Sequence, residues 1–347
     1  MDLIEEELQE EQNKPRITAK GAMNPDKNFL DKFRPMFQRI NEELSGSVGS
    51  HVFLIREVGR HALLGEGKRL RPLLFVLSGQ LCGYGREDIY RLSTIFEYIH
   101  VASLIHDDVL DNAELRRKKP SVRNVWGNLT AVLGGDYLYS KAAGLAIESG
   151  KLEWIKLLND TTRQMVEGQI LELENTHNWE LTRDSYMEII ISKTAVLMSA
   201  ACASGAIVAQ ADRKAFDHLS QFGRNLGIAF QLLDDVLDYT SREEDFGKPV
   251  GKDLREGKIT LPLIYTLQDL GAGERERLKE LFKNKKAREE DHRALITKVR
   301  NNGVIERIKS EARQLLEANG RHLEPFPESA AKEHMLELNR YMVERQH

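Results

Sequence analysis

Apolar residues recur at intervals of three and four along almost the whole chain, and this spacing predicts α-helices. We find no convincing stretch in which apolar and polar residues alternate with a period of two between hairpin turns. The sequence therefore predicts an all-α protein. The expected helices span 29–45, 51–64, 69–82, 87–112, 122–149, 153–174, 182–209, 212–240, 259–270, 274–283, 290–300, 303–319 and 328–344.

The connections between these helices are short, for example at 83–85 and 271–273, as in a compact bundle. We therefore expect a single helical domain over residues 29–347. Residues 1–28 differ from it, because they hold Pro15, Pro25 and many charges but no apolar stripe. We interpret them as a mobile N-terminal arm.

Two of the predicted helices contain segments that are apolar on every side and rich in small residues, 130–144 and 194–211. A helix that is apolar all round lies in the centre of a bundle, where small side chains allow close approach or leave space. Such helices could line an apolar cavity. A packed core or a subunit interface fits these two segments equally well.

Composition narrows the class of protein. The 347 residues are 41% hydrophobic, enough for a large core, and a net charge of −4 gives no basic field for nucleic acid. Cys82 and Cys202 lie in apolar runs and fit a reducing compartment.

The N-terminus lacks the apolar stretch of a secretory signal. We also find no apolar run of the roughly 18 residues that span a bilayer. We expect a cytoplasmic protein without a transmembrane segment.

The pentapeptide Asp-Asp-Val-Leu-Asp occurs twice, each time near the end of a long apolar helix. One such motif would also fit a solvated acidic helix end, but its repetition favours metal binding. Carboxylates near a helix C-terminus are disfavoured by the helix dipole, and Mg²⁺ compensates them while being completed by substrate phosphates. We therefore predict two facing Mg²⁺ sites formed by Asp107, Asp108, Asp111, Asp234, Asp235 and Asp238.

Basic residues near both motifs could bind those phosphates, since arginine binds phosphate bidentately and lysine acts as a point charge. The segment GEGKRLRP, at 65–72, adds a dense basic cluster but lacks the spacing of a nucleotide-binding loop, so kinase chemistry is disfavoured. We interpret Lys118, Lys119, Lys252 and Arg255 as solvated surface charges. The candidate phosphate-binding cations are Lys68, Arg69, Arg71, Arg116, Arg117, Lys248 and Lys258.

Several long motifs in one order together resemble the trans-prenyltransferases, the polyprenyl diphosphate synthase family. They cover about 64–263: GEGKRLRP, EYIHVASLIHDDVLDNAELRRKKPSV, GGDYL, MVEGQ, SKTAVL, FQLLDDVLDYT and GKPVGKDLREGKITLPLI. The resemblance implies an isoprenoid-synthase-type helical bundle around a central apolar cavity, usually a homodimer. Glu66 and Lys118 stand where the family usually has glycine, and neither change removes a predicted ligand.

The resemblance also implies a role for each matching residue. The six aspartates would bind Mg²⁺ ions that bridge them to an allylic diphosphate. The candidate catalytic residues are Lys193, Thr194 and Gln231. The residues that would bind the isopentenyl diphosphate are Lys68, Arg71, His100 and Arg117; those that would bind the allylic diphosphate are Arg116, Lys193, Thr194, Gln231, Lys248 and Lys258.

In such enzymes product length depends on residues one helical turn before the first aspartate motif, which form the tunnel floor. Here they are Ala102 and Ser103, which are too small to block a growing chain. We therefore expect a medium or long product, heptaprenyl to decaprenyl diphosphate. The alternative is a geranylgeranyl product with a deeper floor at Phe96 or within 130–149. A greasy product would allow transient association with a membrane surface.

Two other functions remain as alternatives. A class I terpene cyclase shares the first aspartate motif, but usually carries a different second metal motif and needs no isopentenyl pocket. A non-catalytic subunit that regulates another prenyltransferase would have no use for two intact aspartate clusters.

Overall fold

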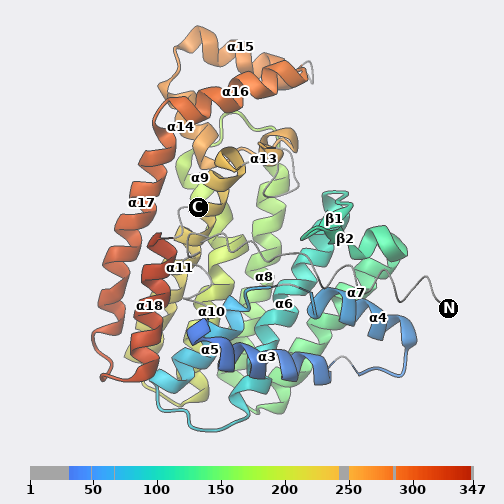
Figure 1. Cartoon of the computed structure of the whole chain (residues 1–347), viewed down its shortest axis with the longest axis vertical. Coiled ribbons are helices and arrows are strands. Elements are labelled where there is room, and N and C mark those ends of the chain that lie inside the picture. The colour runs from blue at the N-terminus through green and yellow to red at the C-terminus, as the bar shows by residue number, and fades with distance from the viewer. Residues whose placement is uncertain (1–30, 48, 66, 242–249, 284–286, 345–347) are drawn as a thin grey trace, which may run out of the picture. The chain divides into compact units, whose positions relative to one another are not determined.

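The computed structural model describes residues 31–47, 49–65, 67–241, 250–283 and 287–344. Its contacts divide the chain into Met1–Arg34 and Pro35–His347. Nearly all of the first unit, including the expected arm over residues 1–28, lies outside the described residues. The second unit is built almost entirely of helices (Figure 1), which confirms the all-α prediction.

The helices agree closely in position with those expected from the periodicity, apart from the short helix Lys252–Arg255, which was not expected. They are α3 (Arg34–Ser47), α4 (Phe53–Leu63), α5 (Leu70–Leu81), α6 (Ile89–Leu110), α7 (Val122–Glu148), α8 (Leu152–Glu174), α9 (Arg183–Ile190), α10 (Val196–Val208), α11 (Arg213–Thr240), α13 (Lys252–Arg255), α14 (Leu261–Asp269), α15 (Ala272–Lys283), α16 (Glu289–Asn301), α17 (Val304–Asn319) and α18 (Ala330–Glu344).

The helix α10 lies in the core, packed against α5, α8 and α11. Every residue from Leu197 to Val208 except Ser199 is buried. A Cβ atom on Gly205 would lie 2.5 Å from the backbone nitrogen of Gly79, so the small residues of α10 allow α5 to approach closely. The segment Arg183–Val208 is long and apolar enough to cross a membrane, but 72% of its apolar window is buried, as in the core helix of a soluble protein.

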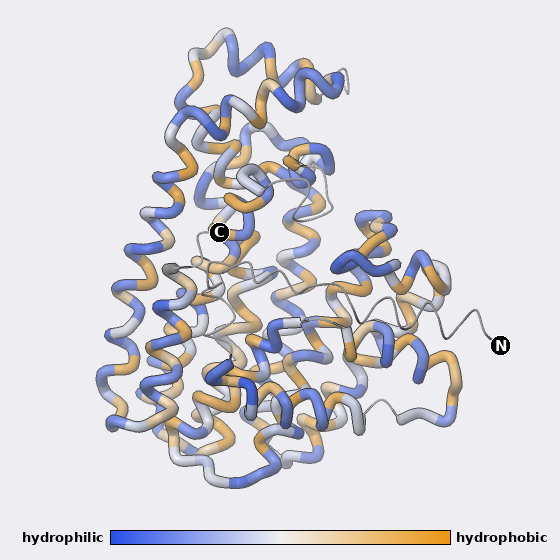
Figure 2. The backbone as a smooth tube through the Cα atoms, viewed as in Figure 1, coloured by the Kyte–Doolittle hydropathy of each residue, from blue (hydrophilic) through white to orange (hydrophobic). Residues whose placement is uncertain are grey.

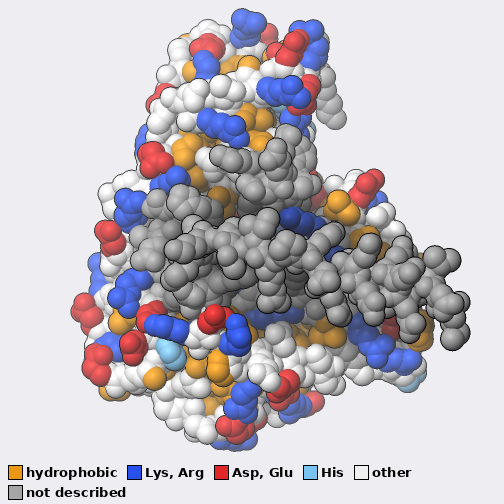
Figure 3. All heavy atoms as spheres, in the orientation of Figure 1, with side chains coloured by type: hydrophobic (Ala, Val, Ile, Leu, Met, Phe, Trp, Pro, Cys, Tyr) orange, Lys and Arg blue, Asp and Glu red, His pale blue; other side chains and the backbone are white. Residues whose placement is uncertain are grey.

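The other helices surround this core. The pair α6 and α7 packs together, and α11 packs against α17, which in turn contacts α18. Hydrophobic and hydrophilic residues alternate along α17 (Figure 2), because one of its faces covers the core. Side chains of both charge signs are interspersed over the described atoms visible in Figure 3, in keeping with the small net charge.

Local signals in the sequence set where several helices begin. The side chains of Ser121, Thr182 and Asp212 each accept a hydrogen bond from a backbone N–H in the first turn of α7, α9 and α11. Such caps satisfy donors that a helix leaves unpaired at its start. They explain why the expected and observed N-termini of these helices agree so well.

The predicted helix over 182–209 is interrupted by a π-helical turn, Ile191–Ala195. Two neighbouring helices approach the backbone of this turn through glycines. A Cβ on Gly168 of α8 would lie 2.8 Å from the nitrogen of Lys193, and one on Gly227 of α11 would lie 2.6 Å from the Cα of Ala195. The turn is therefore held between α8 and α11 by direct contact with its main chain.

A short hairpin follows α6, where we expected no strand. Its strands β1 (Leu115–Arg116) and β2 (Lys119–Pro120) are antiparallel, and Arg116 pairs with Lys119. Arg117 and Lys118 form the turn with φ of 51° and 63°. Two-residue hairpin turns require positive φ, which asparagine and glycine usually supply, so the sequence carried no recognisable turn signal.

Replacing Gly168 with alanine should destabilise the fold, because the new Cβ would meet backbone atoms of the π-turn that cannot move aside. We expect a loss of about 1–3 kcal/mol in the free energy of unfolding, measured by urea denaturation. Gly144→Ala in α7 is the matched control, because nothing lies within 4 Å of a Cβ at that position. Equal stability of the two variants would contradict the close contact.

Candidate functional site

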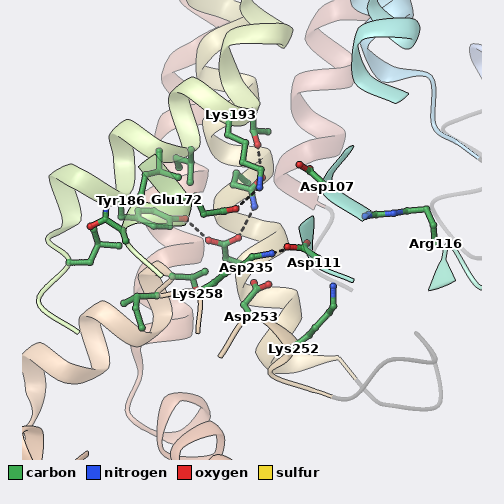
Figure 4. A pocket seen from close by; sticks show the side chains of 18 residues that line it. Asp107, Asp111, Arg116, Glu172, Tyr186, Lys193, Asp235, Lys252, Asp253 and Lys258 are labelled. Atoms are coloured by element: carbon green, nitrogen blue, oxygen red, sulfur yellow. Dashed lines mark hydrogen bonds and ion pairs between the residues drawn. The ribbon is translucent and has the colours of Figure 1, made fainter. Parts of the chain in front are cut away.

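The two aspartate motifs lie at the C-terminal ends of α6 and α11 and contribute to one cavity (Figure 4). Asp107 and Asp111 come from the first motif, and Asp235 comes from the second. Burial raises the pKa of Asp107, and only part of this effect is offset by the nearby Lys193. The carboxylates therefore lie at the unfavourable ends of two helix dipoles, in a partly desolvated place.

Lys258 connects the segment after the second motif to the first motif. Its Nζ lies 3.1 Å from Oδ2 of Asp111 and 2.9 Å from Oε2 of Glu256. Burial by itself would lower the pKa of Lys258, but the carboxylates of Glu172, Asp111 and Glu256 outweigh burial and raise it. The ammonium group of Lys258 therefore stays charged at the edge of the cavity.

Lys193, in the middle of the π-turn, contributes a second ammonium group. Its Nζ lies 2.6 Å from Oε2 of Glu172 in α8 (Figure 4). Thr194 is the next residue, and both line the cavity. The π-turn thus delivers two adjacent polar side chains to the site, as such turns often do where a helix carries function.

The hairpin brings Arg116 back toward the first motif. Its Nε lies 2.8 Å from Oδ1 of Asp108, and its Nη2 donates to the same oxygen. Asp108 is buried, whereas Arg116 lines the cavity. Asp108 therefore holds Arg116 in place, with the rest of the guanidinium at the cavity wall.

Asp235 is hydrogen-bonded through both carboxylate oxygens. Tyr186 donates to Oδ2 at 2.6 Å, and Nε2 of Gln231 lies 2.7 Å from Oδ1. Burial raises the pKa of Asp235 to about 7, although these two hydrogen bonds act in the opposite direction; Asp234 and Asp238 raise it further. Thr194 in turn donates to Oε1 of Gln231 at 2.9 Å.

Asp253 continues the acidic wall beyond Asp235, and Asp238 supports it from outside the lining. The oxygens of Asp238 accept hydrogen bonds from the backbone nitrogens of Lys252, at 3.1 Å, and Asp253, at 3.2 Å. Asp238 thus organises the first turn of α13, the short helix that carries Asp253 into the cavity lining. Burial and then Asp238 and Asp235 raise the pKa of Asp253 well above its usual value.

A cationic group surrounds His100 on α6. The pKa of His100 lies well below its usual value, first because of burial and then because of Arg71, Arg117 and the other nearby arginines. Burial lowers the pKa of Arg71 to about 10, and the Nε of Arg71 is buried without a hydrogen-bond partner among the described residues. A neutral histidine among arginines with an unused donor is suited to an anion.

Gly67 allows this group to pack closely, because a Cβ there would lie 2.7 Å from Nη1 of Arg117. Arg69 has a different function from its neighbours. It is buried and forms an ion pair with Glu97, and its Nε donates to Asn41 at 3.0 Å. Arg69 therefore supports the segment rather than offering a free charge to a ligand.

The structure brings together many of the predicted site residues, but not all of them. Those that line the cavity are Asp107, Asp111, Arg116, Lys193, Thr194, Gln231, Asp235 and Lys258. Those that lie outside its lining are Lys68, Arg71, His100, Ala102, Ser103, Asp108, Arg117, Asp234 and Asp238. Ala102 is fully buried, and Ser103 donates to the carbonyl of His100 at 2.8 Å. Lys248 lies outside the described residues.

Six polar residues of the lining were missed in the sequence: Glu172, Asn175, Tyr186, Lys252, Asp253 and Thr260. Glu172 follows the MVEGQ segment by one helical turn, and Asp253 lies between two lysines of a quoted motif, so both had a signal nearby. Tyr186 had none, because its neighbour Asp235 is distant in sequence. Interpreting Lys252 as a solvated surface charge was wrong, since it is two-thirds buried at the cavity wall.

Comparisons with known proteins show the family of this chain. A sequence model of the family described as polyprenyl synthetase matches residues 53–299. The chain is 35% identical over 314 residues to an octaprenyl diphosphate synthase of Haemophilus influenzae, covering 90% of this chain and 94% of that protein. It is 33% identical over 341 residues to heptaprenyl diphosphate synthase component 2 of Bacillus subtilis, covering 95% and 96%.

Among solved structures, the fold is similar to a polyprenyl synthase of Caulobacter crescentus that was complexed with calcium and isoprenyl diphosphate. The TM-score is 0.86 and the sequence identity 33%, over 92% of this chain and 98% of that one.

The raised pKa of Asp235 predicts how stability without metal depends on pH. The folded protein keeps a proton on Asp235 up to about pH 7, whereas the unfolded chain releases it near 3.8. Stability from this group is therefore lost as pH rises through about 7. In EDTA, we expect the melting temperature to fall as pH rises from about 3.8 to about 7, between the unfolded and folded pKa values of Asp235, and to level off above it.

Adding Mg²⁺ should remove most of this decrease, because the cation takes the place of the proton. Asp235→Asn should also flatten the pH dependence in EDTA, which serves as the control. A melting temperature that rises with pH over this window in EDTA would contradict the assignment.

Proposed function

Because this chain belongs to the polyprenyl synthetase family and is a trans-prenyltransferase, we propose that it condenses isopentenyl diphosphate with an allylic diphosphate. The product would be an all-trans polyprenyl diphosphate of medium or long chain, heptaprenyl to decaprenyl. One observation carries this proposal. Carboxylates of both aspartate motifs line the same cavity as Lys193, Lys258 and Arg116, so one place offers both metal ligands and phosphate-binding cations.

We infer that the cavity binds Mg²⁺ together with the allylic diphosphate. The donors are all carboxylate oxygens, which suits Mg²⁺. Within the described residues, no three acidic, histidine or cysteine side chains converge closely enough to hold an ion by themselves. This fits an ion that the protein holds through one or two carboxylates and that water and phosphate complete. Several such ions would bridge the two motifs, and the residues that would hold them are Asp107, Asp108, Asp111, Asp234, Asp235 and Asp238.

The protein's own side chains would then prepare the diphosphate to leave. Lys193, Lys258 and Arg116 would bind its oxygens, with Lys248 added from the segment before α13. When bound, Mg²⁺ supplies further positive charge against which the allylic C–O bond ionises. Thr194 and Gln231 would lie beside the carbon that becomes positive. This is electrostatic preorganisation, and no nucleophilic side chain is needed.

The second substrate would bind in the cationic group around His100. Lys68, Arg71 and Arg117 would bind the diphosphate of isopentenyl diphosphate, with neutral His100 as a hydrogen-bonding partner. Burial lowers the pKa of Arg71, and the negative charges of Glu97 and Asp234 partly offset this effect, which indicates that Asp234 lies near this group. Holding the double bond beside the cation would contribute an effective molarity of up to about 10⁵ to 10⁸ M. The released diphosphate would accept the final proton.

The assay that tests this function uses purified protein, Mg²⁺, labelled isopentenyl diphosphate and allylic primers of several lengths. We expect elongation by the protein alone. Asp107→Ala and Asp234→Ala should each lower kcat by at least about 100-fold, because each removes a ligand of the Mg²⁺ that would offset the charge developing on the diphosphate. Near-normal turnover by either variant would overturn the metal assignment.

The same assay addresses a second function, regulation of a partner prenyltransferase. The similar Bacillus subtilis protein carries the name component 2, so a two-component enzyme is a specific alternative. If the purified chain elongates no primer but does so when a second protein is added, the regulatory or heteromeric function would be favoured.

We propose that Ala102 and Ser103 form the floor that sets product length. Ala102 is fully buried on α6, one turn before the first motif. A side chain this small leaves room for a long product, whereas a deeper floor would stop the product at geranylgeranyl length. The proposed range therefore rests on the size of Ala102.

Ala102→Tyr should shorten the product, because a ring would fill the space in which later isoprene units lie. Chromatography of the dephosphorylated products would show this as a shift to shorter chains with turnover retained. Phe96→Ala should leave the lengths unchanged if the floor is at Ala102. An unchanged distribution for Ala102→Tyr would remove Ala102 from this role.

We also propose a cytoplasmic homodimer. Apolar side chains are exposed in rows at helical spacing on α7 and α8: Val125, Leu129 and Leu133, and Val166, Ile170 and Leu173. Leu129 is 76% exposed, and exposed apolar rows of this kind usually mark an interface. A second copy of the chain would cover them symmetrically. Sedimentation of the purified protein as a monomer would contradict this proposal.

A further inference from the structure

Tyr186 begins a chain of hydrogen bonds that ends at Thr194. The hydroxyl of Tyr186 donates to Asp235 at 2.6 Å, and Gln231 donates to the other oxygen at 2.7 Å. The hydroxyl of Thr194 then donates to the side-chain oxygen of Gln231 at 2.9 Å. All four side chains line the cavity. Figure 4 shows the contact between Tyr186 and Asp235 at its wall.

The direction of each bond in this chain follows from the chemistry of its members. Gln231 presents its NH₂ group to Oδ1 of Asp235, which leaves its carbonyl oxygen for its other neighbour. The carbonyl oxygen of Gln231 then faces Thr194, which must donate its one hydroxyl proton to it. Thr194 is left with lone pairs alone. Toward the cavity its oxygen can accept a hydrogen bond or face a positive charge, but it has no proton left to donate.

Tyr186 is the first member of this hydrogen-bond chain, because its hydroxyl donates to the second oxygen of Asp235. With Gln231 on Oδ1, both oxygens of this buried carboxyl group are then hydrogen-bonded. The phenol reaches Asp235 from α9, the helix that continues directly into the π-turn carrying Thr194. One segment of the chain thus carries both ends of the hydrogen-bond chain.

We propose that Tyr186 is a positioning residue, which fixes the direction of these hydrogen bonds so that Thr194 presents only an acceptor oxygen to the reacting carbon. The inference rests on the proposed function, which puts Thr194 beside the allylic carbon. An acceptor oxygen held there stabilises the positive charge as it develops, without needing to reorient. A hydroxyl free to rotate would turn its proton toward the cation for part of the time.

The test is a double-mutant cycle with Tyr186→Phe and Thr194→Val. Tyr186→Phe removes only the donor, and we expect kcat to fall about 10- to 100-fold, with KM for both substrates unchanged. In the Thr194→Val background, Tyr186→Phe should change kcat less than about twofold, because the two residues act through one chain. A fall in kcat of equal size in both backgrounds would overturn the proposal, as would a change confined to KM.

Tyr265→Phe is the matched control. Tyr265 is also a buried phenol that donates to a carboxylate, Glu311, at 2.7 Å, but it does not line the cavity. It should retain wild-type kcat with a melting temperature similar to that of Tyr186→Phe. If Tyr265→Phe lowered kcat as much as Tyr186→Phe, the effect would belong to the fold and not to the chain of hydrogen bonds.

A second variant covers the case in which Tyr186→Phe does not fold. Gln231→Leu breaks the same chain at its middle, so its effect on kcat should also disappear in the Thr194→Val background. Additive effects would overturn the proposal. Failure of the proposed function is distinguishable, because the wild-type protein would then elongate no primer. A wild type that elongates, with an additive cycle, removes only the role of Tyr186.

Discussion

The rest of the site depends on one constraint. Two helices bring carboxylates into one partly buried cavity, where these carboxylates repel one another. Both motifs lie at helix C-termini, where the dipole adds to the cost, and burial raises the pKa of Asp107 and Asp235. In the structure, different carboxylates are bound by different partners. Arg116 binds Asp108, Lys258 binds Asp111, and Tyr186 and Gln231 bind Asp235.

After this pairing, the cavity wall still carries charges of both signs that a ligand can neutralise. The acidic wall favours a divalent cation, while Lys193 and Lys258 at the same wall favour an anion. A metal–diphosphate pair supplies both charges at once. The cationic group around His100 has the opposite balance, because arginines crowd a neutral imidazole there. The two environments therefore suit two different diphosphates, one bound with metal and one bound directly, which is the arrangement that the proposed condensation needs.

Close packing between backbones fixes the positions of these charged side chains. Gly168 and Gly227 let α8 and α11 contact the π-turn directly, and that turn carries Lys193 and Thr194. Gly67 likewise lets Arg117 approach the basic segment. Charged side chains are long and flexible, so their positions depend on how firmly the backbone beneath them is held. The hydrogen bonds of Asp238 to the start of α13 serve the same purpose for Asp253.

The sequence by itself determined the helices and most of the chemistry. Apolar periodicity and caps such as Ser121 and Asp212 are local signals, and the repeated aspartate motif with its neighbouring cations is readable without a fold. The tertiary structure decided which of these residues meet. Asp111 and Lys258 are 147 residues apart, and Tyr186 and Asp235 are 49 apart, so no local pattern could pair them.

Tertiary structure also separated residues that look alike in sequence. Asp107, Asp108 and Asp111 belong to one pentapeptide, yet two line the cavity and Asp108 holds Arg116. Arg69 and Arg71 are separated by one residue, yet Arg69 is paired with Glu97, whereas Nε of Arg71 has no hydrogen-bond partner in the described part of the chain. Sequence spacing sets which way a side chain leaves its helix, but only the packing of other helices decides whether it meets a partner, a cavity or the core. The physical reason is that burial and charge pairing are properties of the neighbours that a fold assembles.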